Sequence, residues 1–289
     1  MIARVSASRP FRRAVASALV SSVAIAGCGD GGPSRADVVG ASTDEVVPAR
    51  YADAAALADD VVVAVDAWCD GDEPAVVAEA VASARAAWVE LRPFSFGPAN
   101  DRRSMFVIDP QARTVDVDAL GEGGQDVDAE SLRELAGADQ RGWAAVEHLA
   151  DGEATDRRCD YARGAAELSA TELALLAEDW TTYGPSLGEG DAADVALRNI
   201  VSESIFSSQM AVDEPDPVLD IHRLNGVRLA LLGDGVTDGI APLLSDDLVG
   251  RLGAELDAVD AMAVQITIST DVVGELGTTV NFSDADGDG

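Results

Sequence analysis

The feature that most constrains the fold of this chain is a series of Ala-, Val- and Leu-rich segments separated by short clusters of Gly, Pro and Asp. Ala and Leu favour helices over strands. Apolar residues also recur at helical spacing, as at Val77, Val81, Ala84, Trp88 and Leu91. The sequence therefore predicts an all-α protein made of two packed helical bundles. The expected helices span residues 49–69, 74–91, 128–136, 139–150, 156–181, 191–212, 216–232 and 245–269.

The segments between these helices define the expected domain organisation. Residues 28–46 are rich in Gly, Ser, Asp and Pro, which is typical of a flexible tether. The Gly and Pro residues at 184–190 predict a break between a first half, about 47–185, and a second half, about 186–289. Little regular structure is expected over 99–127 and 270–289.

The N-terminus has the pattern of an export signal. Residues 1–27 contain four arginines and no acidic residue, and their apolar stretch, 14–26, is too short for a stable membrane span. The stretch ends in Ile25-Ala26-Gly27-Cys28, which is similar to a bacterial lipobox, where the Cys is lipidated and the chain is cut just before it. The sequence therefore predicts a signal peptide over 1–27, a lipid on Cys28, and a place in the cell envelope, on the outer membrane or the periplasmic face of the inner membrane. The alternative is an ordinary secretory peptide with an incidental Cys.

The charge of the chain excludes several kinds of partner. Its 20 basic residues, all of them Arg, stand against 52 acidic residues, and the net charge is −32. Nucleic acids and anionic lipid surfaces bind proteins through Lys and Arg patches that release counterions. We therefore expect no nucleic-acid partner, and contact with the membrane through the lipid anchor rather than through charge.

Two further cysteines, Cys69 and Cys159, remain once Cys28 carries the lipid. In an oxidising envelope compartment a pair of thiols tends to form a disulfide. The sequence therefore predicts a bond between Cys69 and Cys159, and the alternative is two buried thiols that do not meet.

Several segments of the chain carry a recognisable pattern. They are Ala84-Arg85-Ala86-Ala87-Trp88 with Phe94-Ser95-Phe96-Gly97-Pro98, Gln140 to Leu149, Arg157-Arg158-Cys159, and Leu276 to Asp288. In this order, over about residues 84–289, they resemble the imelysin family, the imelysin-like or insulin-cleaving membrane protease-like proteins of the bacterial envelope. The resemblance implies a fold of two four-helix bundles for residues 47–289 and a link to bacterial iron uptake, and some members of the family are described as metallopeptidases.

The signature of that family is Gly-x-His-x-x-Glu, and this chain departs from it. Gly142 and Glu147 match, but Ala144 stands at the His position. A His and a Glu three residues apart share a helix face and can bind one cation together, whereas an Ala methyl group offers no ligand atom. The resemblance therefore implies a degenerate site for a metal ion such as iron, zinc or calcium, with Glu147 as its remaining ligand. The other candidate binding residues are Arg141, Gly142, Ala144, Phe96, Gly97 and Pro98.

The two histidines of the chain are further candidate ligands. His148 lies one turn after Ala144, but neighbouring side chains on a helix diverge by roughly 100°, so it points away from Glu147. It is either a displaced metal ligand or, as we expect, a residue that fills a packing position. His222 has no partner at metal-binding spacing, and we expect a packing role for it as well.

Other chemistry has little support in the sequence. The chain has no His-Glu-x-x-His motif and no Walker or dinucleotide phosphate loop. Its C-terminal Asp284-x-Asp286-x-Asp288 resembles the start of a calcium loop, but the bidentate acid that completes such a loop is missing. Arg92 and Arg141 are candidates to bind an acidic group, although ion pairs at the surface or between helices are their expected role.

Three functions are consistent with these features. The one we favour is a non-catalytic binding protein of the cell envelope, associated with iron or metal uptake and with a ligand or partner protein in the envelope. The second is a metallopeptidase, which needs about three protein ligands and an open position for water. The third is a structural envelope lipoprotein. The side chains that contact Glu147 in the fold distinguish these functions. Other carboxylates or His148 beside Glu147 would preserve a metal site, whereas an Arg partner would not.

Overall fold

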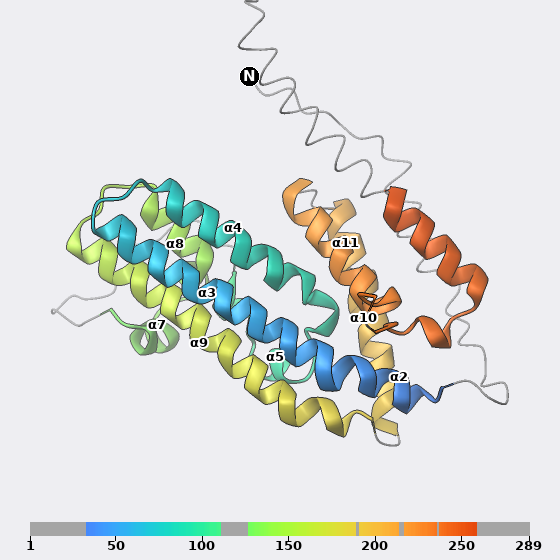
Figure 1. The fold of residues 1–289 in the computed structure, drawn as a ribbon. Helices are drawn as coiled ribbons and strands as arrows, with labels where there is room; N and C mark the ends of the chain where they lie inside the picture. The colour runs from blue at the N-terminus through green and yellow to red at the C-terminus, as the bar shows by residue number, and fades with distance from the viewer. Residues whose placement is uncertain (1–32, 111–126, 189–190, 214–216, 236, 259–289) are drawn as a thin grey trace, which may run out of the picture.

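Four helices form the larger group of the fold. They are α3 (Val47–Cys69), α4 (Ala75–Glu90), α8 (Trp143–Ala150) and α9 (Asp156–Ser186), and the most extensive contact is that of α3 with α9 (Figure 1). The computed structural model describes residues 33–110, 127–188, 191–213, 217–235 and 237–258. All regular elements in these ranges are helical, so the predicted all-α class is confirmed.

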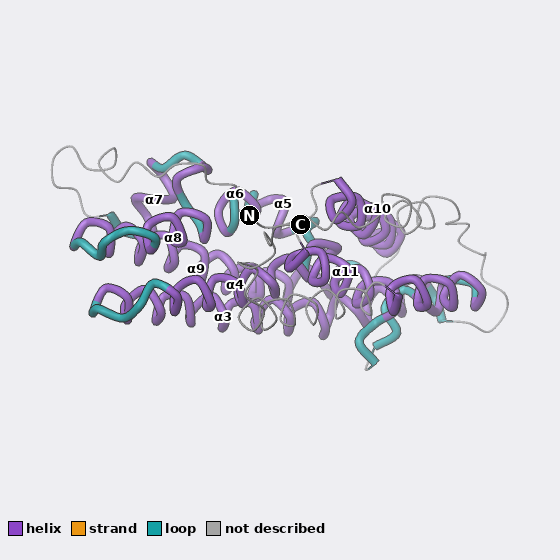
Figure 2. Tube along the Cα trace, turned by 90° about the horizontal axis from the view of Figure 1, so that it is seen from above, coloured by secondary structure: helices purple, strands orange, loops and turns teal. Residues whose placement is uncertain are grey.

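A second group of helices lies beside one end of the first (Figure 2). It contains α10 (Asp191–Asp213), α11 (Pro217–Leu232) and a helix at residues 246–258. α10 and α11 pack on each other, and α11 also packs on α4. Gly226 of α11 permits a close approach to α4, because a Cβ at this position would collide with the backbone of Glu90.

Aromatic side chains connect the helices at the centre of the molecule. Tyr51 of α3 stacks on Trp180 of α9 with ring centroids 6.1 Å apart, and it meets Trp88 of α4 edge-on at 6.4 Å. Phe96, in the turn after α4, meets Trp180 edge-on at 5.5 Å. The buried hydroxyl of Tyr51 donates a hydrogen bond to the carbonyl oxygen of Phe94 (3.2 Å), and burial raises the pKa of Tyr51. The hydroxyl therefore stays protonated and its donor is satisfied.

Residues 34–46 are helical, so the predicted flexible tether is wrong for this segment. α2 (Arg35–Ala41) begins with a capping box between Ser34 and Asp37, and η1 (Ser42–Val46), a turn of π-helix, joins α2 to α3. The Gly- and Ser-rich composition favoured a tether, but the capping box is itself a signal for the start of a helix.

This N-terminal segment packs on the end of α9. Val39 and Thr43 are fully buried, and the hydroxyl of Thr43 donates to the carbonyl oxygen of Gly184 (3.3 Å). A Cβ at Gly184 would collide with the backbone of Thr43. Gly184 is therefore a packing residue inside α9, which continues past Gly184-Pro185 and ends at Ser186, within the range 184–190 where the break was predicted. Pro185 is the last residue but one of α9, and the helix ends directly after it, at Ser186.

The connection between α4 and α8 contains more regular structure than expected. The 3-10 turn η2 (Arg92–Phe94) is followed by two short helices, α5 (Pro98–Asp101) and α6 (Met105–Ile108). The bounds of α7 (Ala129–Leu135) agree closely with those of the helix predicted at 128–136. The 3-10 turn η3 (Ala138–Gln140) precedes α8. A last 3-10 turn, η4 (Ala241–Leu243), precedes the helix at 246–258. The leader, Cys28, residues 111–126 and the C-terminal segment from 259 lie outside the described residues.

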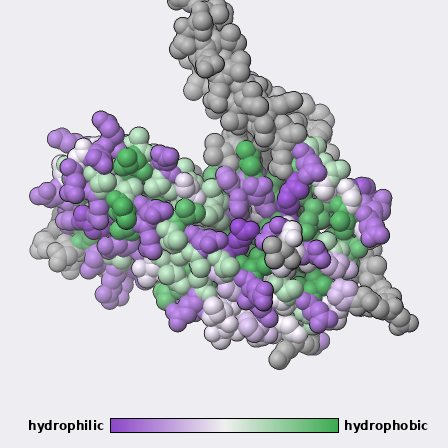
Figure 3. Space-filling model, viewed as in Figure 1, coloured by the Kyte–Doolittle hydropathy of each residue, from purple (hydrophilic) through white to green (hydrophobic). Residues whose placement is uncertain are grey.

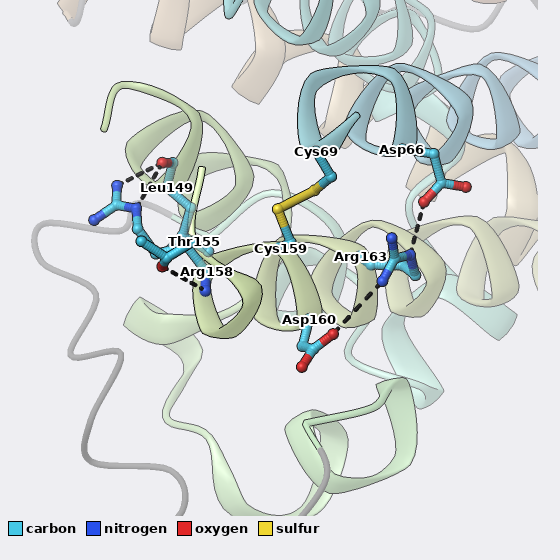
Figure 4. The surroundings of a disulfide bond; sticks show 8 residues. All are labelled: Asp66, Cys69, Leu149, Thr155, Arg158, Cys159, Asp160 and Arg163. Carbon is cyan, nitrogen blue, oxygen red and sulfur yellow. Dashed lines mark hydrogen bonds and ion pairs between the residues drawn. A yellow bond between two sulfur atoms is a disulfide. The ribbon is translucent and has the colours of Figure 1, made fainter. Parts of the chain in front are cut away.

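A disulfide joins Cys69, at the end of α3, to Cys159, in the first turn of α9 (Figure 4). Their α-carbons lie 5.8 Å apart. Next to the bond, Nε of Arg163 on α9 donates to Oδ1 of Asp66 on α3 at 2.7 Å. The disulfide and this ion pair together hold one end of the α3–α9 pair.

Hydrophilic residues cover much of the face seen in Figure 3, and the apolar areas between them are small. Such a surface is expected for a chain with a net charge of −32. In the described ranges, no helix combines the length and the apolar character that crossing a bilayer requires.

Removal of the disulfide should reduce stability substantially. The bond connects residues separated by 90 positions, and the loop-entropy model gives about 4–5 kcal/mol for a loop of this size. We expect the double variant Cys69→Ser/Cys159→Ser to lose about this much free energy of unfolding in urea while keeping a helical circular dichroism spectrum. Equal stability of the variant and the native chain would contradict a constraining role for the bond.

Candidate functional site

The motif helix α8 begins at a backbone conformation that favours glycine. Gly142 has φ 75° and ψ −170°, a region that residues with a Cβ rarely adopt. A Cβ there would lie 2.5 Å from the carbonyl oxygen of Ile108 and 2.7 Å from the ring of Pro110. Gly142 is therefore explained by the close approach of α8 to the C-terminal end of α6 and to Pro110, and this packing sets the position of Glu147.

Arg85 of α4 joins two carboxylates at once. Its Nη1 and Nη2 donate to Oε1 and Oε2 of Glu147 at 3.0 and 2.8 Å. Its Nε and Nη2 donate to Oδ2 and Oδ1 of Asp109 at 2.8 and 3.0 Å. Both pairs have the bidentate geometry that makes guanidinium–carboxylate contacts strong. We refer to Arg85, Asp109 and Glu147 as the Arg85 cluster.

Burial and the neighbouring charges shift the pKa values of Arg85 and Asp109 in opposite directions. The side chains of Arg85 and Asp109 are 16% and 18% exposed, and that of Glu147 is 36% exposed. Desolvation raises the pKa of Asp109, and the charge and hydrogen bonds of Arg85 offset only part of this rise. Desolvation acts to lower the pKa of Arg85, but the two carboxylates outweigh it and the net pKa is raised. The guanidinium therefore remains charged while it holds both acids.

The Arg85 cluster does not have the composition of a metal site. Ala144 lies half-buried on α8, one turn before Glu147, and offers no ligand atom. Arg85 contacts both carboxylate oxygens of Glu147, which a cation would need. Among the side chains that the structure describes, no group of three or more His, Cys, Asp and Glu could hold a metal ion. The residues present around Glu147 therefore do not fit a bound metal.

Within the described residues, neither histidine side chain forms a hydrogen bond or ion pair with this cluster. His148 is exposed on α8, and its backbone carbonyl accepts a hydrogen bond from Arg158 at 3.1 Å. In the second group of helices, Nδ1 of His222 lies 2.8 Å from Oε1 of Glu90, which also accepts from the amide of Asn225 at 3.3 Å. His222 therefore connects α11 to the end of α4 through a polar contact, in place of the packing role that we expected.

The Phe96-Gly97-Pro98 turn serves packing in the structure. Phe96 is 5% exposed and rests on Trp180. Gly97 has φ 54°, and a Cβ there would collide with the ring of Tyr183. Pro98 is buried and begins α5. The turn therefore leads the chain from α4 onto the face of α9, and it contributes no contact to the Arg85 cluster.

The two arginines singled out from the sequence have different environments. Arg92 is 7% exposed, its guanidinium lies 5.7 Å from the centre of the Phe206 ring, and burial lowers its pKa. Arg141 donates to the carbonyl oxygens of Phe106 (2.8 Å) and Arg133 (3.0 Å). Within the described residues, neither arginine forms the ion pair that we expected.

A second buried cluster surrounds Glu172, which sequence reasoning missed. Its fully buried carboxylate accepts hydrogen bonds from Arg102 (3.0 and 3.2 Å), Arg133 (2.6 Å) and Ser104 (2.7 Å). Burial acts to raise the pKa of Glu172, but these hydrogen bonds outweigh burial and the net pKa is lowered. A sequence signal exists, because Glu172 follows Leu168 by four residues and so lies on the buried stripe of α9, where a carboxylate needs partners.

Residues 184–188 read Gly-x-Ser-x-Gly, which is the pattern of a hydrolase nucleophile turn. That turn connects a strand to a helix, whereas these residues lie at the C-terminal end of α9. The hydroxyl of Ser186 is exposed and donates to the carbonyl oxygen of Tyr183 (2.6 Å). The pattern is therefore explained by the end of the helix and not by catalysis.

Replacement of Arg85 should be costly because it leaves a buried acid without its partner. We expect Arg85→Met to lower the free energy of unfolding by about 3 kcal/mol at neutral pH, and Arg85→Lys to recover only part of this loss because an ammonium cannot form both bidentate pairs. Arg163→Met, which removes an exposed pair, should cost less than about 1 kcal/mol. Urea denaturation of the three variants tests the expectation, and equal losses for Arg85→Met and Arg163→Met would contradict it.

The Glu172 cluster predicts a particular pH dependence. The pKa of Glu172 is lowered by folding, so its ionised form stabilises the native state above the unfolded pKa of about 4.3. This stabilisation is lost as the pH falls through the folded pKa. The stability difference between the native chain and Glu172→Gln should therefore be largest at pH 7 and shrink below about pH 4. Denaturation at both pH values measures this, with the exposed Glu178→Gln as control; a pH-independent difference would refute it.

Comparison with known proteins agrees with this helical architecture. The family model Peptidase_M75: Imelysin matches residues 47–214, which is more than half of the chain. The crystal structure of an imelysin-like protein from Psychrobacter arcticum 273-4 has a similar fold, with a TM-score of 0.63 and 17% sequence identity over 81% of this chain and 85% of that chain. No curated protein matches the sequence. The chain belongs to the imelysin family.

Proposed function

We propose that this chain is a lipid-anchored protein of the bacterial cell envelope that acts as a non-catalytic binding protein, associated with the uptake of iron or another metal. The observation that supports the non-catalytic part is the Arg85 cluster. Arg85 donates hydrogen bonds to both carboxylate oxygens of Glu147, and Ala144 occupies the position at which the family motif has its His. Metal-dependent hydrolysis needs about three protein ligands and an open position for water, and this cluster supplies neither.

In this proposal the guanidinium group of Arg85 replaces a metal ion between the two carboxylates. Two carboxylates that approach from α8 and from the end of α6 repel each other unless a positive charge lies between them. The guanidinium supplies that charge permanently and with a geometry that matches two carboxylates. It offers no vacant coordination position at which a water molecule or a peptide carbonyl could be activated.

The link to metal uptake comes from membership of the imelysin family. The name of the family model, Peptidase_M75, also states the alternative, which is peptide hydrolysis. A third alternative is a structural lipoprotein that binds no small ligand. Metal content separates the peptidase from the other two, because a peptidase of this type depends on a bound ion.

The test measures metal binding in the native chain and in a variant that restores the ligands. All contacts described above lie within residues 33–258, so a chain that begins at Gly29 retains them. Purified without chelator and equilibrated with Fe²⁺, Zn²⁺ or Ca²⁺, the native chain should contain no stoichiometric metal by mass spectrometry. Arg85→Ala/Ala144→His frees both carboxylates and adds an imidazole, and it should bind about one ion per chain.

A matched control places the new histidine elsewhere. Arg85→Ala/Ala174→His has the same composition, but its histidine lies on the exposed face of α9, and it should bind less metal than the restored site. Stoichiometric metal in the native chain that is lost in Glu147→Gln would overturn the proposal and favour the metallopeptidase.

The proposed anchor has a separate test. In a bacterial host, the full chain should incorporate labelled fatty acid and sediment with membranes, because lipidation of the Cys28 side chain and amino group provides more than one acyl chain. Cys28→Ala should abolish both. Membrane association that persists in Cys28→Ala would contradict the lipid anchor.

A further inference from the structure

A pocket with a cavity volume of about 860 Å³ opens beside α5, α6 and the connection from α7 to α8. Four of its lining residues are arginines, and none is acidic; the arginines are Arg102, Arg103, Arg133 and Arg141. We refer to it as the arginine pocket. It takes none of its lining from the Arg85 cluster, so its role is independent of the function proposed above.

Positive charge exceeds negative charge at this pocket. Glu172 pairs with Arg102 and Arg133, and Asp179 lies 3.4 Å from Arg102. Within the described side chains, no carboxylate contacts Arg103 or Arg141. The chain as a whole has 52 acidic and 20 basic residues. The arginine pocket is therefore a positively charged region on a protein whose net charge is negative.

Three of the four guanidinium groups, those of Arg102, Arg133 and Arg141, are held in place before any ligand arrives. The buried carboxylate of Glu172 fixes Arg102 and Arg133, with contacts of 3.0 and 2.6 Å. Two backbone carbonyl groups fix Arg141. Groups that are already ordered lose less conformational freedom on binding, which favours affinity.

Arg103 adds a second observation. Its φ is 54°, in the left-handed region. In the described part of the chain, no other residue except glycine has a positive φ. Residues with a Cβ occur there infrequently, and glycine or asparagine would be less strained. A long cationic side chain is therefore kept at the edge of the pocket at a conformational cost, which is a feature of binding sites.

We infer that the arginine pocket binds a compact oxyanion that carries two or more negative charges on carboxylate or phosphate groups. Guanidinium forks recognise both groups through paired hydrogen bonds. The cavity volume lies within the range of small-ligand sites. The acidic surface elsewhere repels anions, so saturable binding of an anion to this protein has to be local. Phe106, which is 55% exposed and lines the pocket, adds apolar contact area for the carbon skeleton of an organic ligand.

The test is calorimetric titration of the chain from Gly29 with citrate and with inorganic phosphate, in metal-free buffer at constant ionic strength. We expect saturable binding of one anion per chain for at least one of these probes. Arg103→Gln should weaken it at least about tenfold, because a hydrogen bond between charged groups is lost. Arg133→Gln should weaken it as well. The probe that binds more tightly distinguishes a polycarboxylate from a phosphate ligand.

Arg198→Gln is the matched control, because Arg198 is exposed on α10 and does not line the pocket. It should leave the affinity unchanged. The absence of saturable binding for both probes would overturn the inference, and so would an equal loss in Arg198→Gln and Arg103→Gln, since that result would indicate charge screening rather than a site. Neither result would bear on the metal-binding test, which changes different residues.

Discussion

The pairing of α3 with α9 is the constraint on which the rest of the structure depends. Tyr51 stacks on Trp180 near the middle of the pair, and the disulfide from Cys69 to Cys159 holds one end. At the other end, the N-terminal segment packs against α9 at Gly184. α4 and α8 complete the group around this pair, and α10 and α11 then pack on α4 and the turn that follows it. Large aromatic surfaces contribute strongly to such a core.

Arginines act as the cations of the interior. Arg85 neutralises the acids that approach from two segments, and Arg102 and Arg133 neutralise the buried Glu172. A planar guanidinium bonds carboxylates in pairs and remains charged when buried, which an ammonium does less well. The chain has no Lys, and its internal ion pairs use this property. Under the proposed function, the same property lets the family fold keep a motif Glu where the His is missing.

Local features of the fold could be predicted, and features that depend on contact between helices could not. The helices at 156–181 and 191–212 were found because apolar periodicity and breaker residues are local signals. The segment 34–46 was misjudged because composition outweighed its capping box. The helix expected at 156–181 continues to Ser186, because Gly184 serves a close approach to another segment inside the last turns of α9.

The sequence by itself determined the all-α class and the departure at Ala144, since these follow from residue chemistry and local spacing. Only the tertiary structure decided what Glu147 does, because its partner Arg85 lies 62 positions away and on a different helix. The partners of Glu172 are 70 and 39 positions away for the same reason. Ion pairs between helices have no fixed spacing in sequence, because helix packing alone decides which faces meet.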